Sequence, residues 1–226
     1  MTLEMFLALL GWGTLVGVDL VSLPQMMIAR PVVAGTVAGA ILGDVEAGLK
    51  IGVVFELLQY DIIPVGAVRL PEYGPATVAA VATAHTAAGA LGLGLGTVVG
   101  LVIGLVGGVA QLLLRRVNSR VVHEASVALE SGDPQVLIRL HVGGLLRDVA
   151  RAALVTLVGL AVAWYVPPHI NWVLTPRGAT LLAVAAVACA LAAGAAGTLR
   201  LVGHGPNLRW FALGLAGGVV VAAWLR

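Results

Sequence analysis

Acidic and amide side chains gather in one apolar stretch of the sequence, between residues 24 and 75. Glu56 is the most informative of them, because it follows Gly48 by eight residues inside an apolar run. An ionised carboxylate is unfavourable in hydrocarbon, so it persists there only when it is paired, hydrated or protonated. Glu56 could therefore accept hydrogen bonds from a polar solute such as a sugar. Alternatively, it is a structural partner for a backbone N–H group or for Arg30.

The side chains around Glu56 offer a hydroxylated ligand both donors and acceptors. On a helix, Gln59 and Tyr60 share a face with Glu56, and their amide and phenol groups complement its carboxylate. Asp44 lies between two short apolar runs, where capping a helix and contacting a sugar are open alternatives. Tyr60 and Asp61 could instead mark a helix end at the membrane interface. The predicted substrate-binding residues are Glu56, Gln59, Asp44, Asp61, Gln25 and Glu72.

Nothing in the sequence indicates catalysis, a metal site or a cofactor. The five histidines are scattered, and no pair has the spacing of a zinc site. The G-x-S-x-G, P-loop and H-E-x-x-H motifs of hydrolases, nucleotide-binding proteins and metalloproteases do not occur. Cys189 is the single cysteine, which excludes a disulfide framework within this chain. We predict no catalytic residue, no metal and no cofactor, so energy for transport would come from another component.

The composition is that of an integral membrane protein. Of 226 residues, 60% are hydrophobic and 11% are charged, and the mean hydropathy is +1.03, whereas soluble domains carry about 25% charged residues. The net charge of +2 comes from arginines clustered in one connection, which does not indicate a nucleic-acid partner. No basic residue precedes the first apolar run, so we expect a retained helix over residues 3–23 and no cleaved signal.

The lengths of the apolar runs predict an all-α, polytopic fold with broken or re-entrant half-helices. The runs 31–43 and 48–58 are shorter than the ~20 residues that cross a bilayer. One helix over residues 76–114 would reach roughly 58 Å, nearly twice the hydrocarbon thickness, so we expect two segments that break between residues 87 and 95. Half-helices with charges at membrane depth are typical of a transport site. Glycines recurring at every fourth position predict close helix packing; they are Gly35, Gly39 and Gly43, and Gly92, Gly96, Gly100, Gly104 and Gly108.

The distribution of charge divides the chain into three parts. Residues 1–114 form an N-terminal membrane half, with the substrate-site region at 24–75. Residues 115–151 hold six arginines and form an amphipathic connection, which the positive-inside rule places in the cytoplasm. This connection is either a solvated loop or a docking surface for a cytoplasmic partner. Residues 152–226 form a C-terminal membrane half.

The motifs of residues 30–75 resemble a known family. They run R-P, a glycine-spaced segment, L-G-D, two glycines four residues apart, E-L, P-x-G and P-E in that order. This order is similar to that of the membrane subunit IIC of the mannose/fructose/sorbose class of the bacterial phosphoenolpyruvate:sugar phosphotransferase system. The residues that carry the motifs are Arg30, Pro31, Gly43, Gly52, Pro64, Gly66 and Pro71.

The resemblance implies a sugar-translocating subunit in the bacterial inner membrane. It implies an oligomer with a IID membrane subunit, embedded in lipid, that passes a hexose to the cytoplasm. There IIA and IIB proteins relay phosphate to the sugar, so IIC is not an enzyme by itself, and neither His123 nor His141 is a phosphohistidine. The family's sugar contacts fall in the broken-helix region, where Glu56 and Asp44 match, and its members are thought to slide a core domain against a scaffold.

This chain departs from the family pattern at Tyr60-Asp61 and at Arg69. Two alternatives therefore stand beside transport by a IIC subunit. One is a non-transporting sensor or scaffold that holds a regulator on the arginine-rich connection. The other is a proton-coupled secondary carrier in which Asp61 or Glu56 titrates.

Overall fold

The chain is all-helical in a computed structural model that describes residues 1–23, 25–60, 70–87, 89–170 and 174–202, with the short stretches 209–210, 212–214 and 216–217. The helices are α1 (Leu3–Asp19), α2 (Pro31–Leu42), α3 (Val45–Gln59), α4 (Tyr73–Ala87), α5 (Gly89–Glu124), α6 (Ser126–Glu130), α7 (Pro134–Ile170) and α8 (Pro176–Val202). Within the described ranges, α5, α7 and the Pro176–Ala196 part of α8 are long and apolar enough to cross a membrane. The predicted helical membrane fold is confirmed.

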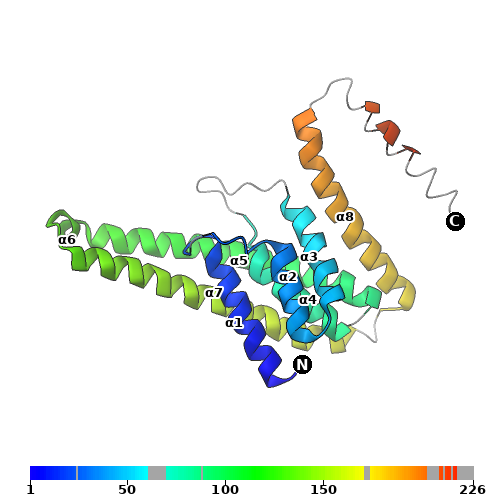
Figure 1. Ribbon diagram of the computed structural model, residues 1–226, viewed down its shortest axis with the longest axis horizontal. Coiled ribbons are helices and arrows are strands. Elements are labelled where there is room, and N and C mark those ends of the chain that lie inside the picture. Colours follow the sequence, from blue (N-terminus) through cyan, green and yellow to red (C-terminus); the bar gives the residue numbers. More distant parts are fainter. Residues whose placement is uncertain are drawn as a thin grey trace.

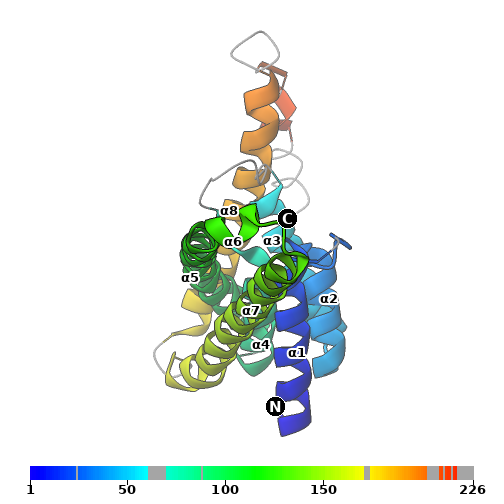
Figure 2. The same ribbon diagram turned by 90° about the vertical axis from the view of Figure 1, so that its left-hand side faces the viewer.

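The helices form a packed body and a projecting arm (Figure 1). The body contains α1 to α4, the first half of α5 and the second half of α7, and α8 packs against α3 and α5. The arm, residues 109–147, is a hairpin of the remaining halves of α5 and α7 closed by α6, and none of its residues is buried. Figure 2, which views the molecule from the end of the arm, shows α5 and α7 side by side with α1 and α2 on one flank.

Helix α4 is the centre of the body. Every residue from Tyr73 to Ala84 is buried, because α1, α2, α3, α5 and α7 all contact this helix. Its hydroxyl groups remain satisfied at this depth: Thr77 donates to the carbonyl of Tyr73 at 2.7 Å and Thr83 to that of Ala79 at 2.8 Å. At 15 residues, α4 is too short to cross a bilayer by itself.

The break predicted between residues 87 and 95 is confirmed, because α4 ends at Ala87 and α5 begins at Gly89. Gly89 has φ +55°, a left-handed conformation that glycine adopts without steric cost. The glycine stripe of α5 then lies against α4. A Cβ atom at Gly96 would come within 2.6 Å of the carbonyl oxygen of Ala80, so the two backbones touch. Close packing is therefore the role of this stripe.

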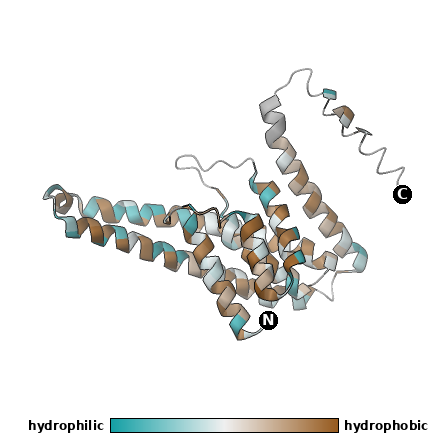
Figure 3. Ribbon diagram, in the orientation of Figure 1, coloured by the Kyte–Doolittle hydropathy of each residue, from teal (hydrophilic) through white to brown (hydrophobic). Residues whose placement is uncertain are grey.

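Helices α5 and α7 extend across both predicted boundaries of the amphipathic connection at residues 115–151. Both α5 and α7 continue without a break across residues 114–115 and 151–152, so the division into three parts is not marked by helix ends and stays a prediction. Figure 3 shows hydrophilic residues interleaved with hydrophobic ones along the arm, in contrast to the more uniformly apolar helices of the body.

Candidate functional site

The α2–α3 hairpin is built by the residue types at its turn. Gly43 ends α2 with φ +74°, the left-handed conformation of a helix C-cap, and the N–H of Asp44 donates to the carbonyl of Gly39 at 2.8 Å. The side chain of Asp44 then accepts from the N–H of Ala47 at 3.0 Å and caps α3. Asp44 therefore does act as a helix cap, which was one of its two predicted roles.

The two helices of the hairpin are in backbone contact. A Cβ atom at Gly35 would lie 2.6 Å from the carbonyl oxygen of Gly48, and one at Gly52 would lie 2.8 Å from that of Pro31. Such close approach needs glycine on both sides and lets dispersion contacts hold the helices together in lipid, where the hydrophobic effect does not. The hairpin is therefore a closely packed pair of half-helices.

Glu56 joins the two helices at the open end of the hairpin. One carboxylate oxygen accepts from the N–H of Val32 at 3.2 Å, and the other pairs with the guanidinium of Arg30. The Glu56 side chain is 19% exposed and that of Arg30 is 44% exposed. Both structural partners considered for this carboxylate, a backbone donor and Arg30, are thus in contact with it.

Gln59 and Glu72 meet at a separate place. Both line a cavity of about 30 Å³, roughly the size of one water molecule, and Gln59 Oε1 is buried without a hydrogen-bond partner. Gln25 lies at the surface, where its Nε2 donates to the carbonyl of Leu20 at 3.3 Å. Asp61, Pro64 and Gly66 lie outside the described residues.

The predicted contacts therefore do not form one cluster. Asp44 precedes the first turn of α3 and Glu56 lies in its last turn, roughly 18 Å apart along a helix. Gln59 and Glu72 are the pair that the fold brings together.

A buried charge network at the base of the arm was not foreseen. Arg151 donates from Nε to Asp148 at 2.8 Å and from Nη2 to the carbonyl of Gly17 at 2.9 Å, and it pairs with Glu72. Ser22 donates to the second oxygen of Asp148. The network ties α1, α4 and α7 together. The Asp148-x-x-Arg151 pair immediately before an apolar run was the available sequence signal, since charges that enter a membrane segment are usually paired.

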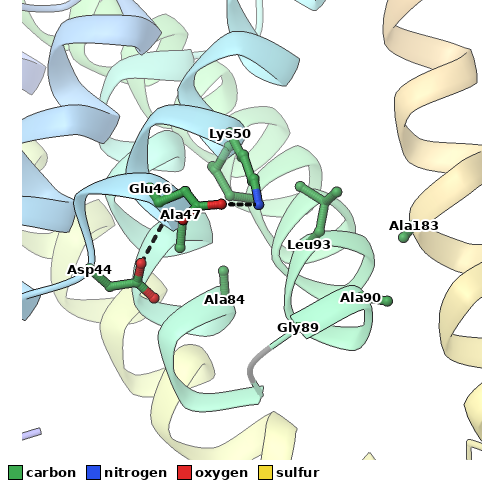
Figure 4. A pocket seen from close by; sticks show the side chains of 10 residues that line it. Asp44, Glu46, Ala47, Lys50, Ala84, Gly89, Ala90, Leu93 and Ala183 are labelled. Atoms are coloured by element: carbon green, nitrogen blue, oxygen red, sulfur yellow. Dashed lines mark hydrogen bonds and ion pairs between the residues drawn. The ribbon is translucent and has the colours of Figure 1, made fainter.

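The larger cavity beside the hairpin holds about 500 Å³ and is lined from α3, α4, α5 and α8 (Figure 4). Asp44, Glu46 and Lys50 supply its polar groups, and Glu46 and Lys50 form an ion pair at 2.6 Å. Ile51 and Leu93 belong to its apolar wall. In the described part of the chain no three His, Cys, Asp or Glu side chains gather as a metal ion would require.

A family model described as the sorbose-specific IIC component of the phosphotransferase system (PTS) matches residues 3–223. The chain belongs to this IIC family. Among curated relatives, the mannose-specific EIIC component of Escherichia coli K12 is 25% identical over 132 residues, covering 58% of this chain and 49% of that protein. The sorbose-specific EIIC component of Lacticaseibacillus casei is 27% identical over 158 residues, covering 70% and 55%. The matched part thus spans about half the length of these relatives.

Two solved structures share the fold of this IIC chain. One, described as a membrane protein, has a TM-score of 0.76 at 19% identity and covers 100% of this chain and 96% of its own. The other, a complex of the mannose transporter ManYZ with microcin E492, has a TM-score of 0.59 at 19% identity and covers 97% and 87%. The resemblance seen in the sequence motifs is therefore confirmed at the level of family and fold.

The motif residues of this IIC chain that the structure describes have structural roles. Pro31 is the first residue of α2, where its missing N–H costs no hydrogen bond. Gly43 makes the turn, Gly52 allows helix contact and Arg30 pairs with Glu56. Pro71 directly precedes Glu72 and α4. Arg30, Pro31, Gly43 and Gly52 together build the hairpin.

Proposed function

We propose that this chain is the sugar-translocating IIC subunit of a mannose-class phosphotransferase permease in a bacterial inner membrane. It binds a hexose within the membrane and delivers it to a cytoplasmic IIB protein, which phosphorylates it with phosphate relayed by IIA. A IID membrane subunit is its partner, and IIC itself performs no catalytic step. The observation that carries the proposal is the family match along residues 3–223.

The hexose site of this proposal is the 500 Å³ cavity beside the hairpin. Its volume lies within the roughly 300–1,000 Å³ of small-molecule sites. Asp44 uses Oδ1 in the helix cap, which leaves Oδ2 to accept from a sugar hydroxyl. Lys50 and Glu46, four residues apart on α3, supply a donor and an acceptor at the rim. The apolar wall suits the C–H faces of a sugar ring.

Two of the remaining predicted contacts, Glu56 and Glu72, have positioning roles in this proposal. Glu56 holds the open end of the hairpin through Arg30 and the Val32 N–H. Glu72 anchors α4 to α7 through Arg151. The hairpin and its cavity then move as one unit when the sugar changes sides. Gln25, Gln59 and Asp61 stay secondary candidates for contact with the sugar along its path.

The experiment is hexose binding by the chain reconstituted with a IID subunit, measured for Asp44→Asn and Asp44→Ala. Asparagine caps a helix as well as aspartate does, so Asp44→Asn separates the lost carboxylate from a lost cap. A hydrogen bond to a charged group contributes about 1.5–3 kcal/mol, so we expect Asp44→Asn to weaken binding by roughly ten- to a hundredfold. Unchanged affinity in both variants would remove Asp44 from the site.

Glu56→Gln and Glu56→Ala are the matched comparison, because Glu56 lies at the other end of α3. We expect sugar affinity to be kept in Glu56→Gln. A larger loss of sugar affinity in Glu56→Gln than in Asp44→Asn would move the sugar site to the open end of the hairpin.

The two alternative functions give different results in a sugar-uptake assay. A sensor produces no uptake. A proton-coupled carrier transports without partner subunits, and its transport stops when an uncoupler is added.

A further inference from the structure

A second large cavity lies within the arm, away from the proposed sugar site. It is an open hollow of about 430 Å³ between α5 and α7, and Val21 and Ser22, which follow α1, line its inner end. Its walls are mostly apolar and come from both sides of the hairpin; they include Val121, Val122, Leu129, Leu137, Leu140 and Leu145. From Leu137 to Arg147 along α7 the helix advances roughly 15 Å, so the apolar wall is long enough for a stretch of acyl chain.

Polar groups collect at the inner end of this arm cavity. Arg147 lines it, and within the described residues its side chain donates one hydrogen bond, from Nε to the carbonyl of Gly143 at 2.9 Å. No ion pair to Arg147 occurs within the described residues, because the neighbouring carboxylate of Asp148 is bound by Arg151. Asn118 also lines the cavity, and its Oδ1 atom is buried without a partner. Within the described residues, a guanidinium without an ion pair and a buried acceptor without a partner thus belong to side chains at the same end of the cavity.

The surface of the arm is suited to lipid. Large apolar side chains are exposed on it, including Val127, Leu137, Ile138 and Leu146, which water alone would not favour. The arm meets α8, which is long and apolar enough to cross a membrane, at a steep angle (Figure 1), so a bilayer that α8 crosses keeps the arm oblique to its surface. The arginines of residues 115–147 place it at the cytoplasmic leaflet, where anionic lipids lie.

We propose that the arm cavity binds an anionic glycerophospholipid with a hydroxylated headgroup, such as phosphatidylglycerol. The terminal nitrogens of Arg147 bind the phosphate, since a guanidinium matches its oxygens in charge and geometry. A headgroup hydroxyl donates to Asn118 Oδ1, which removes the cost of the buried unpaired acceptor. One acyl chain lies along the apolar wall. The lipid fastens the two halves of the arm to each other and to the segment after α1.

The test is native mass spectrometry of the full chain in detergent with added dioleoyl lipids. We expect phosphatidylglycerol to bind at least about tenfold more tightly than phosphatidylcholine, because the charged contact is specific. Arg147→Gln should remove that preference, and Arg147→Lys should keep part of it. The matched control is Arg139→Gln, an exposed arm arginine that does not line the cavity, and it should bind phosphatidylglycerol as the unaltered chain does.

Two further variants separate the contacts. Asn118→Ala should weaken phosphatidylglycerol binding severalfold but leave phosphatidic acid, whose phosphate carries no headgroup alcohol, unaffected. Leu140→Trp fills the apolar wall and should reduce both lipids alike, which tests the site if Arg147→Gln fails to fold.

Equal loss in Arg139→Gln and Arg147→Gln would mean diffuse charge attraction and would overturn the proposal. Displacement of the lipid by millimolar inorganic phosphate would overturn it too, because the acyl contact would then be unnecessary. So would a partner subunit that fills the cavity in the purified complex and excludes lipid. None of these measurements uses a sugar, so their outcome is independent of whether the chain transports one.

Discussion

Replacing Arg151 with methionine should destabilise the whole body more than any other single charge removal. The side chains of Arg151 and Glu72 are 6% and 7% exposed, and that of Asp148 is 1% exposed. Methionine keeps much of the volume but leaves two carboxylates buried without their cation. Removing one partner of a buried ion pair typically costs about 3–5 kcal/mol, because the remaining charge is uncompensated.

The expected loss is large enough to measure by thermal unfolding. For a chain of this size, 1 kcal/mol shifts the melting temperature by roughly 2–4 °C, so Arg151→Met should lower Tm by about 10 °C. Tryptophan fluorescence in detergent, at constant detergent and salt, is the assay. Arg139→Met, on the exposed face of the arm, should change stability by less than about 0.5 kcal/mol.

A double variant distinguishes burial of charge from loss of packing. Glu72→Gln together with Arg151→Met leaves one buried carboxylate where Arg151→Met leaves two, so it should be more stable than Arg151→Met alone. If Arg151→Met melts within about 1 °C of Arg139→Met, the charges are hydrated in the membrane-embedded protein, and the reasoning from burial is refuted.

Three smaller effects follow from the hairpin, each measured by the same unfolding assay. Gly35→Ala should cost about 1–3 kcal/mol, because its Cβ would meet the Gly48 carbonyl at 2.6 Å, whereas Gly11→Ala, with nothing within 4 Å, should not destabilise; equal effects would contradict the close contact. Gly43→Ala should cost about 1–2 kcal/mol, because alanine at φ +74° is strained, and a neutral result would mean that the turn relaxes. Glu56→Gln should cost at most about 1 kcal/mol, since the Arg30 side chain is partly exposed, and high salt should shrink the difference; a loss as large as that of Arg151→Met would show a fully desolvated pair.

Local features of the fold were accessible from the sequence because they depend on neighbours along the chain. The break after Ala87 follows from comparing an apolar length with a bilayer. The two short runs correspond to α2 and α3, and Asp44 caps α3 because aspartate after a glycine C-cap meets free N–H groups. The glycine stripes also indicated close packing correctly, since their spacing alone places them on one helix face.

The partners of the charged residues were not accessible in the same way. Arg151 and Glu72 are 79 positions apart, and nothing local indicates that α7 delivers one to the other. The sequence groups Arg151 with the arginines of the predicted cytoplasmic connection, whereas the fold buries its side chain. For Glu56 the sequence already offers Arg30 or a backbone N–H group as a partner. The tertiary fold shows that both are in contact with the carboxylate and that the N–H group is that of Val32.

The backbone contact between α2 and α3 leaves no layer of side chains that can repack between them. Sliding one helix past the other would drive Cα atoms into carbonyl oxygens, so the pair has a single arrangement. Spin labels attached to the outer faces of α2 and α3 should therefore keep one narrow separation through the transport cycle.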